Sequence, residues 1–127
     1  AIAGLLEGIR YIRRKRREII YAHELALSVQ IIQGLMRIPQ VHVLCPDAVH
    51  RVATVSFTVH QRDTSEICER LDASYDIACR AGLHCAPFAH KAYQTLESGT
   101  IRISPGYFNT PREIDSFLDA MDHIACH

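Results

Sequence analysis

The sequence predicts a two-layer α+β sandwich, in which helices cover one face of a mostly antiparallel sheet. Its 127 residues, 48% of them hydrophobic, suffice for one domain around one core. The expected elements follow the order helix, strand, strand, helix, strand, strand, helix. Hairpin-like pairs of strands that alternate with helices favour an α+β arrangement of this kind.

The N-terminal part of the chain is expected to be helical. Residues 2–12 are typical of the end of a helix, and residues 13–36 predict a long helix that Pro39 ends. Apolar residues recur in this helix at intervals of three and four positions, which indicates one buried stripe. The predicted stripe consists of Ala22, Leu25, Val29, Ile32 and Met36.

Two strands and a capped helix follow. Residues 41–44 predict a short strand, and residues 52–60, which alternate β-branched and small side chains, predict the clearest strand of the chain. The residues from Asp63 to Glu66 carry helix caps and an early acid, so a helix is expected to run to about Tyr75. Ile67 and Leu71 are the expected buried residues of that helix.

The C-terminal half repeats this pattern. A strand is expected at 77–80, a loop at 82–87, a helical turn within 88–96 and a strand at 100–104. Thr110, Pro111 and Glu113 predict the start of the last helix, with Thr as cap, Pro first and Glu third. Its predicted buried stripe is Ile114, Phe117, Leu118 and Met121.

Charge and composition exclude several classes of protein. Lys plus Arg and Asp plus Glu balance at 14 each, which argues against a nucleic-acid-binding domain. The basic run from Arg13 to Arg17 is interpreted as a solvated helical face. No apolar run approaches the roughly 18 residues that a membrane span needs. Five cysteines without framework spacing and no secretory signal favour reduced thiols and a cytoplasmic location.

Cys85 is the leading candidate for chemistry. It lies in a predicted loop after a strand, next to His84 and shortly after Arg80. A thiol reacts as the thiolate, which neighbouring positive charge stabilises. On these local features a buried structural cysteine remains an alternative. A zinc site of His84, Cys85, His90 and Cys79 is a weaker alternative, because the spacing matches no common ligand pattern.

Arg102 is the second candidate. Between Ile101 and Ile103 in a strand, its side chain points to the opposite face of the sheet, which is either solvent or a site. A guanidinium group there could bind a substrate carboxylate through two hydrogen bonds. The remaining histidines show no ligand spacing: His23, His42, His50, His60, His123 and His127.

Two segments resemble one known family. The run from Arg80 to Pro87 (RAGLHCAP) and the run from Gly99 to Thr110 (GTIRISPGYFNT) are similar to the C-terminal part of the cysteine desulfurase and selenocysteine lyase branch of class V aminotransferases. Either run alone would be a weak match, but both at this separation are fairly specific.

The resemblance implies a reaction and its residues. In this family, pyridoxal phosphate binds substrate cysteine, an enzyme thiolate attacks the substrate sulfur, and alanine is released while a persulfide stays on the enzyme. Cys85 matches the persulfide-forming cysteine, and Arg102 matches the arginine that binds the substrate carboxylate. Arg80 and His84 match the loop around the nucleophile and are expected to support substrate binding. A sulfur-acceptor protein and a homodimer are the implied partners.

The resemblance also implies that residues 1–127 form a C-terminal small domain. The lysine that binds the cofactor belongs to a large upstream domain in this family, and neither Lys15 nor Lys91 matches its motif. We therefore expect this chain alone to be inactive, with an exposed apolar face that favours association. A non-catalytic interaction module and a class V enzyme with another reaction remain alternatives.

Overall fold

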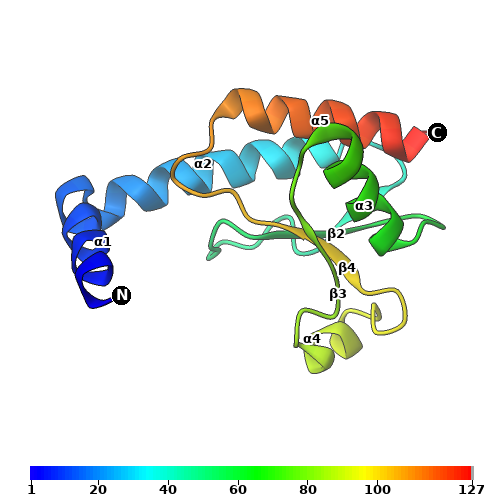
Figure 1. The fold of residues 1–127 in the computed structure, drawn as a ribbon. Helices are drawn as coiled ribbons and strands as arrows, with labels where there is room; N and C mark the ends of the chain where they lie inside the picture. Colours follow the sequence, from blue (N-terminus) through cyan, green and yellow to red (C-terminus); the bar gives the residue numbers. More distant parts are fainter. Residues whose placement is uncertain (127) are drawn as a thin grey trace.

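The fold of the chain is a four-stranded sheet with helices gathered on one side and an N-terminal helix that projects away from it (Figure 1). A computed structural model describes residues 1–126. The order of elements agrees with the α+β class that the sequence predicts. The elements are α1 (Ile2–Lys15), α2 (Arg17–Leu35), β1 (Val41–Val43), β2 (Val55–Val59), α3 (Thr64–Tyr75), β3 (Arg80–Gly82), α4 (Pro87–Ala92), β4 (Thr100–Ile103) and α5 (Pro111–Cys126).

The sheet has the order β1-β2-β4-β3, and every neighbouring pair is antiparallel. The central strand β2 buries alternate residues, as expected for a sheet with one face against the core, and β4 buries Ile101 and Ile103 together with Thr100. Val55, Phe57 and Ile101 point into the core, whereas Ser56 and Arg102 lie opposite each other on the other face. This second face is the one that carries polar residues.

Three helices cover the apolar face of the sheet. In Figure 1, α2, α3 and α5 lie on one side of the strands, while the short α4 lies on the opposite side. The core is built from aliphatic side chains together with Phe57 and Phe117, whose rings meet edge to face with centroids 6.3 Å apart. Ile67 and Leu71 of α3 are fully buried, as the sequence predicts.

The helices α2 and α5 run side by side in the same direction (Figure 1). The Gln30 side chain donates to Asp115 Oδ1 at 2.6 Å. One turn further on, the Leu118 side chain occupies the space that a Cβ atom on Gly34 would need. Gly34 thus permits the close approach of the two helices.

The buried stripe of α2 differs from the predicted one. The buried residues are Leu27, Ser28, Ile31, Ile32 and Leu35. Val29 and Met36, which belong to the predicted stripe, are exposed. Because apolar residues occur on more than one side of this helix, spacing alone allows two stripes. The sheet and α5 select the one that they cover.

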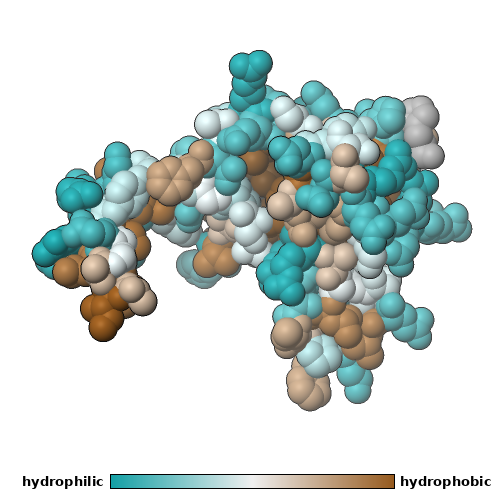
Figure 2. Space-filling model, in the orientation of Figure 1, coloured by the Kyte–Doolittle hydropathy of each residue, from teal (hydrophilic) through white to brown (hydrophobic). Residues whose placement is uncertain are grey.

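The two N-terminal helices meet at Arg16, where φ is 67° and the backbone leaves the helical region. The predicted boundary at residues 12–13 is therefore wrong by about one turn. None of the described residues of α1 is buried. Figure 2 shows hydrophobic residues on this projecting helix, and the exposed ones are Ile2, Leu5, Leu6, Ile9 and Ile12.

Two predicted strands start too early. The strand predicted at 77–80 begins only at Arg80. The reason is that Ile77 N–H donates to the Leu71 carbonyl at 3.0 Å and completes the end of α3. Residues 52–54 do not extend β2, since Thr54 N–H donates to the Val52 carbonyl at 2.7 Å in a tight turn. Such local hydrogen bonds compete with strand pairing.

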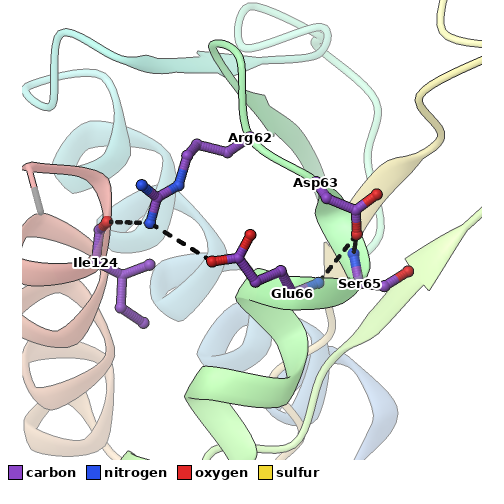
Figure 3. Close-up of polar contacts among 5 residues, drawn as sticks. All are labelled: Arg62, Asp63, Ser65, Glu66 and Ile124. Atoms are coloured by element: carbon purple, nitrogen blue, oxygen red, sulfur yellow. Dashed lines mark hydrogen bonds and ion pairs between the residues drawn. The ribbon is translucent and has the colours of Figure 1, made fainter.

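Hydrogen bonds at the start of α3 cap this helix and link it to α5. Asp63 accepts hydrogen bonds from the backbone N–H groups of Ser65 and Glu66, at 2.8 and 3.0 Å, as the N-cap of α3. Figure 3 shows Arg62 beside this cap, where it donates to the carbonyl of Ile124 in α5 at 3.3 Å. The start of α3 is thereby tied to the end of α5.

The predicted start of α5 is confirmed. Thr110 N–H donates to Glu113 Oε2 at 2.7 Å, and Glu113 N–H donates to Thr110 Oγ1 at 3.3 Å. This reciprocal pair is a capping box, with Pro111 at the first helical position. Among residues 1–126, no helix is long and apolar enough to cross a membrane.

Candidate functional site

The polar face of the sheet places three polar side chains in a row. Ser56 of β2 is paired with Arg102 of β4, and Arg102 is paired with Arg80 of β3. Residues directly opposite one another on antiparallel strands share a face of the sheet. The register therefore brings together the two arginines that the sequence analysis named from separate segments.

A cavity of about 470 Å³ lies against this face. Arg102 and Ser56 form part of its floor, and α4 and the segment between β1 and β2 form its walls. A hydrogen bond from Cys45 Sγ to Tyr93 Oη, 3.0 Å long, joins two of the lining residues. The cavity is of the size that small-molecule sites have.

The wall between β1 and β2 is held by Arg51. Its guanidinium group donates to the carbonyls of Cys45 and Pro46, at 2.6 and 2.9 Å. The Tyr21 hydroxyl of α2 donates in turn to the Arg51 carbonyl at 3.2 Å. These bonds fix a segment that has no regular secondary structure, so the cavity keeps one wall in place without a helix or strand.

His84 lines the cavity and is fixed by Thr100 of β4. Its Nε2 lies 3.1 Å from the Thr100 carbonyl oxygen and 3.2 Å from Thr100 Oγ1. Because a carbonyl can only accept, the contact assigns the proton to Nε2. The Nδ1 atom is buried without a hydrogen-bond partner among the described residues. The ring of the buried His90, held by Thr95, lies 5.9 Å away.

Positive charge surrounds His84. Burial lowers the pKa of His84, although the hydrogen bond to Thr100 raises it, and the charges of Arg102, His90 and Arg80 lower it further. The lowered pKa of His84 favours a neutral imidazole at neutral pH. The positive charge near His84 therefore comes from Arg102 and Arg80, which suits an anionic ligand.

Cys85 lies beside the cavity and is exposed to solvent. Its neighbours His84 and Ala86 line the cavity, whereas the Cys85 side chain does not. His84 and Cys85 both adopt left-handed backbone conformations, with φ of 52° and 58°. The alternative of a buried structural cysteine is therefore wrong.

The structure adds site residues that the sequence analysis did not name. Ser56 stands next to Arg102, and Tyr93 and Cys45 bridge the cavity. The alternation of small polar residues within the predicted strand at 52–60 could have indicated Ser56. No sequence pattern links Cys45 to Tyr93, because they lie far apart in the chain.

Of the remaining histidines, His50 lines the cavity, whereas His23 and His123 make hydrogen bonds elsewhere. His23 contacts the Asn109 carbonyl at 2.9 Å through Nε2, and His123 contacts the Tyr75 hydroxyl at 2.9 Å through Nδ1. His127 lies outside the described residues. Over residues 1–126, no three His, Cys, Asp or Glu side chains gather as a metal site would require.

The comparisons with known proteins identify the family. The sequence profile of the aminotransferase class-V family matches residues 1–117. The chain therefore belongs to the aminotransferase class-V family.

Individual relatives are cysteine desulfurases. The chain is 33% identical to a probable cysteine desulfurase of Synechocystis over 90% of its length, which is 27% of that relative. It is 38% identical to a probable cysteine desulfurase of Mycolicibacterium paratuberculosis over 96% of its length, but over only 17% of that relative. The chain thus spans less than a third of the length of these relatives.

Solved structures show the same fold. The apo cysteine desulfurase of Thermococcus onnurineus superposes with a TM-score of 0.87 at 30% identity, over 97% of this chain and 30% of that one. The cysteine desulfurase CsdA of Escherichia coli, at 23% identity, superposes with a TM-score of 0.78 over 90% of this chain and 27% of that one. The α+β class is thereby confirmed.

The lysines of this chain do not fit pyridoxal phosphate, which enzymes bind through a lysine Schiff base. Lys15 is the last residue of the projecting helix α1. Its Nζ lies 5.9 Å from the Tyr11 ring centroid and 6.0 Å from that of Tyr107. Lys91 is an exposed residue of α4, and neither lysine lines the cavity. The described residues offer two paired arginines and an exposed thiol, but no lysine at the cavity.

Proposed function

We propose that this chain is the C-terminal small domain of a cysteine desulfurase that depends on pyridoxal phosphate. One observation carries the proposal. The polar face of the sheet sets Arg102 opposite Arg80, and the strand that contains Arg80 leads directly into the loop of the exposed Cys85. An anion site and an accessible thiol are therefore held by one pair of strands.

Arg102 binds the carboxylate of substrate cysteine, and Arg80 supports it. Like charges directly opposite each other destabilise a sheet. Among residues 1–126 neither arginine has an ion pair with an acidic side chain. A substrate carboxylate would offset their repulsion and accept two hydrogen bonds from a guanidinium fork. His84, neutral and bonded to Thr100, positions the start of the Cys85 loop.

Cys85 accepts the sulfur. Its thiolate attacks the substrate sulfur, a sulfur–sulfur bond forms, and the bond between that sulfur and the substrate Cβ breaks. The electron pair of the broken bond stays with the substrate carbon, which takes up a proton and leaves as alanine. Pyridoxal phosphate supplies the electron sink for this chemistry when it is bound. The persulfide stays on Cys85.

The remaining parts of the enzyme lie outside this chain. The cofactor lysine belongs to a large domain upstream, so residues 1–127 alone do not turn over. The exposed position of Cys85 would let a sulfur-acceptor protein reach the persulfide. We place the enzyme in the cytoplasm, as a homodimer, in keeping with its reduced cysteines and its family.

The test is carried out on the full-length holoenzyme that contains this chain. Incubation with cysteine should add one sulfur to Cys85, detected by mass spectrometry of the peptide, and alanine should accumulate. Cys85→Ser should abolish both, whereas Cys126→Ser, which removes another exposed thiol on α5, should leave both unchanged. Full alanine production by Cys85→Ser would contradict desulfuration and support another class V reaction.

A further inference from the structure

Two cysteines outside the site described above lie in contact. Cys68 is in α3, and Cys79 immediately precedes β3. Their sulfur atoms are 3.0 Å apart, with the Cys79 thiol donating to Cys68 Sγ. A disulfide bond is about 2.05 Å long, so the two sulfurs lie within about 1 Å of bonding distance. Both residues are half-buried, so small reagents can reach them.

The surrounding packing holds the two sulfurs together. Cys68 and Cys79 both pack against the core, beside the fully buried Ile67 and Leu71. Ile77 N–H bonds to the Leu71 carbonyl and fixes the segment that returns to β3. The contact is thus a property of the connection between α3 and β3.

The pair is chemically unequal. The hydrogen bond from Cys79 lowers the pKa of Cys68, although burial raises it. The same hydrogen bond and burial raise the pKa of Cys79, so Cys79 stays protonated as the donor. A dithiol with one favoured thiolate and one neighbouring thiol is the arrangement that thiol–disulfide exchange uses.

We propose that Cys68 and Cys79 form a redox site that small disulfides, of the class of glutathione disulfide, convert to an intrachain disulfide. The Cys68 thiolate attacks one sulfur of the reagent, and one thiolate leaves. Cys79 then loses its proton and attacks Cys68 Sγ, and the second thiolate leaves. The two cysteines lose two electrons and two protons, which reduce one disulfide to two thiols.

This site is independent of the desulfurase proposal. Neither Cys68 nor Cys79 lines the cavity of about 470 Å³, although Cys79 lines a smaller pocket with Arg80 and Arg102, and the exchange needs no cofactor. The bond would join α3 to the residue before Arg80, and so would restrain the strand that leads to Cys85. The other described cysteines are not part of this pair. Cys45 donates a hydrogen bond to Tyr93, and Cys85 and Cys126 are exposed.

The experiment is thiol trapping on the whole 127-residue chain. The chain is equilibrated in glutathione buffers of graded ratio, alkylated with N-ethylmaleimide and digested with trypsin. Cleavage after Arg62, Arg70 and Arg80 separates the two cysteines into peptides 63–70 and 71–80. We expect these peptides to be joined, with the loss of two alkylation sites. We also compare the ratio of reduced to oxidised glutathione at which half of the pair is oxidised. This ratio should be about tenfold or more higher in native buffer than in concentrated urea, because folding holds the thiols together.

Matched variants identify the pair. Cys68→Ser and Cys79→Ser should each abolish the joined peptide, and Cys126→Ser should retain it with an unchanged midpoint. Circular dichroism of each variant confirms that it is folded. Full alkylation of both Cys68 and Cys79 at every ratio would overturn the proposal. So would the appearance of separate glutathione adducts on both residues, or a midpoint unchanged by urea.

Discussion

Two consecutive residues in the loop that follows β3, His84 and Cys85, both have positive φ. Residues other than glycine rarely adopt this backbone conformation, and each one that does costs about 1 kcal/mol or more in the free energy of folding. The contact of His84 with Thr100 holds the first of them in place. The result is a short turn that keeps the Cys85 thiol in solvent beside the cavity.

Arg102 is expected to act through the shape of its guanidinium group as well as its charge. Arg102→Lys in the holoenzyme keeps the charge but loses the two parallel hydrogen bonds to a carboxylate. We expect KM for cysteine to rise by about tenfold or more, which corresponds to about 1.4 kcal/mol. Arg112→Lys, on the exposed first turn of α5, is the matched control and should leave KM unchanged. An unchanged KM for Arg102→Lys would argue against carboxylate binding at this residue.

The ends of some helices and strands could be predicted from neighbouring residues in the sequence, whereas the ends of others could not. The caps at Asp63 and Thr110 could be predicted because a cap depends on residues close in sequence. The start of β3 could not, because Ile77 is drawn into the end of α3 by a backbone hydrogen bond that any residue type can make. The buried stripe of α2 also needed the tertiary structure.

The start of α5 gives a pH-dependent contribution to stability. Hydrogen bonds from Thr110 lower the pKa of Glu113 below its ordinary value of 4.5. A lowered folded-state pKa stabilises the fold above the ordinary pKa, and this contribution is lost as the pH falls through and below 4.5. We expect Glu113→Gln to lower the free energy of unfolding near pH 7 and to converge with the wild type in acid.

Urea unfolding at a series of pH values measures this difference. Glu69→Gln, on an exposed position of α3, serves as the control and should run parallel to the wild type. A Glu113→Gln deficit that is constant at every pH would show that the carboxylate charge contributes nothing at the cap.

The connection between β3 and β4 depends on a close contact between two glycines. Gly99 has φ of 65°, and a Cβ atom there would lie 2.7 Å from Gly82 Cα. Neither backbone can move without breaking strand pairing, so Gly99→Ala should cost more than about 1 kcal/mol in the free energy of unfolding. Gly106→Ala, where a Cβ would meet Asn109 Oδ1 at 3.9 Å, should cost much less. Equal midpoints of thermal unfolding for the two variants would refute this explanation.

At the scale of the whole molecule, the predicted layers and the antiparallel sheet are observed, while the cavity could not be foreseen. Arg102 was recognised from its place between two isoleucines, which fixes its face. Its neighbours across the sheet depend on a strand order, β1-β2-β4-β3, that no local pattern encodes. The wall held by Arg51 depends on hydrogen bonds to carbonyls, which sequence does not distinguish.

The apolar face of α1 predicts how the isolated chain behaves in solution. Leu5 and Ile9 are exposed on this helix, together with further aliphatic side chains. Apolar surface of this kind favours self-association. We expect sedimentation to show a concentration-dependent dimer of the 127-residue chain, and Ile9→Asp to weaken it by about tenfold or more.

Glu7→Ala, on the same helix, removes a charge without touching the apolar residues and should leave association intact. A chain that stays monomeric at high concentration, or one in which Ile9→Asp changes nothing, would show that α1 is not the contact.

Both outer strands of the sheet, β1 and β3, are only three residues long. An outer strand exposes unpaired backbone groups, and long flat ones recruit further chains into fibrils. Here Arg80 places a charge on β3, and Gly82, with φ of 104°, turns the backbone out of the strand. The features that present Arg80 and the Cys85 loop therefore also protect this edge against aggregation by strand addition.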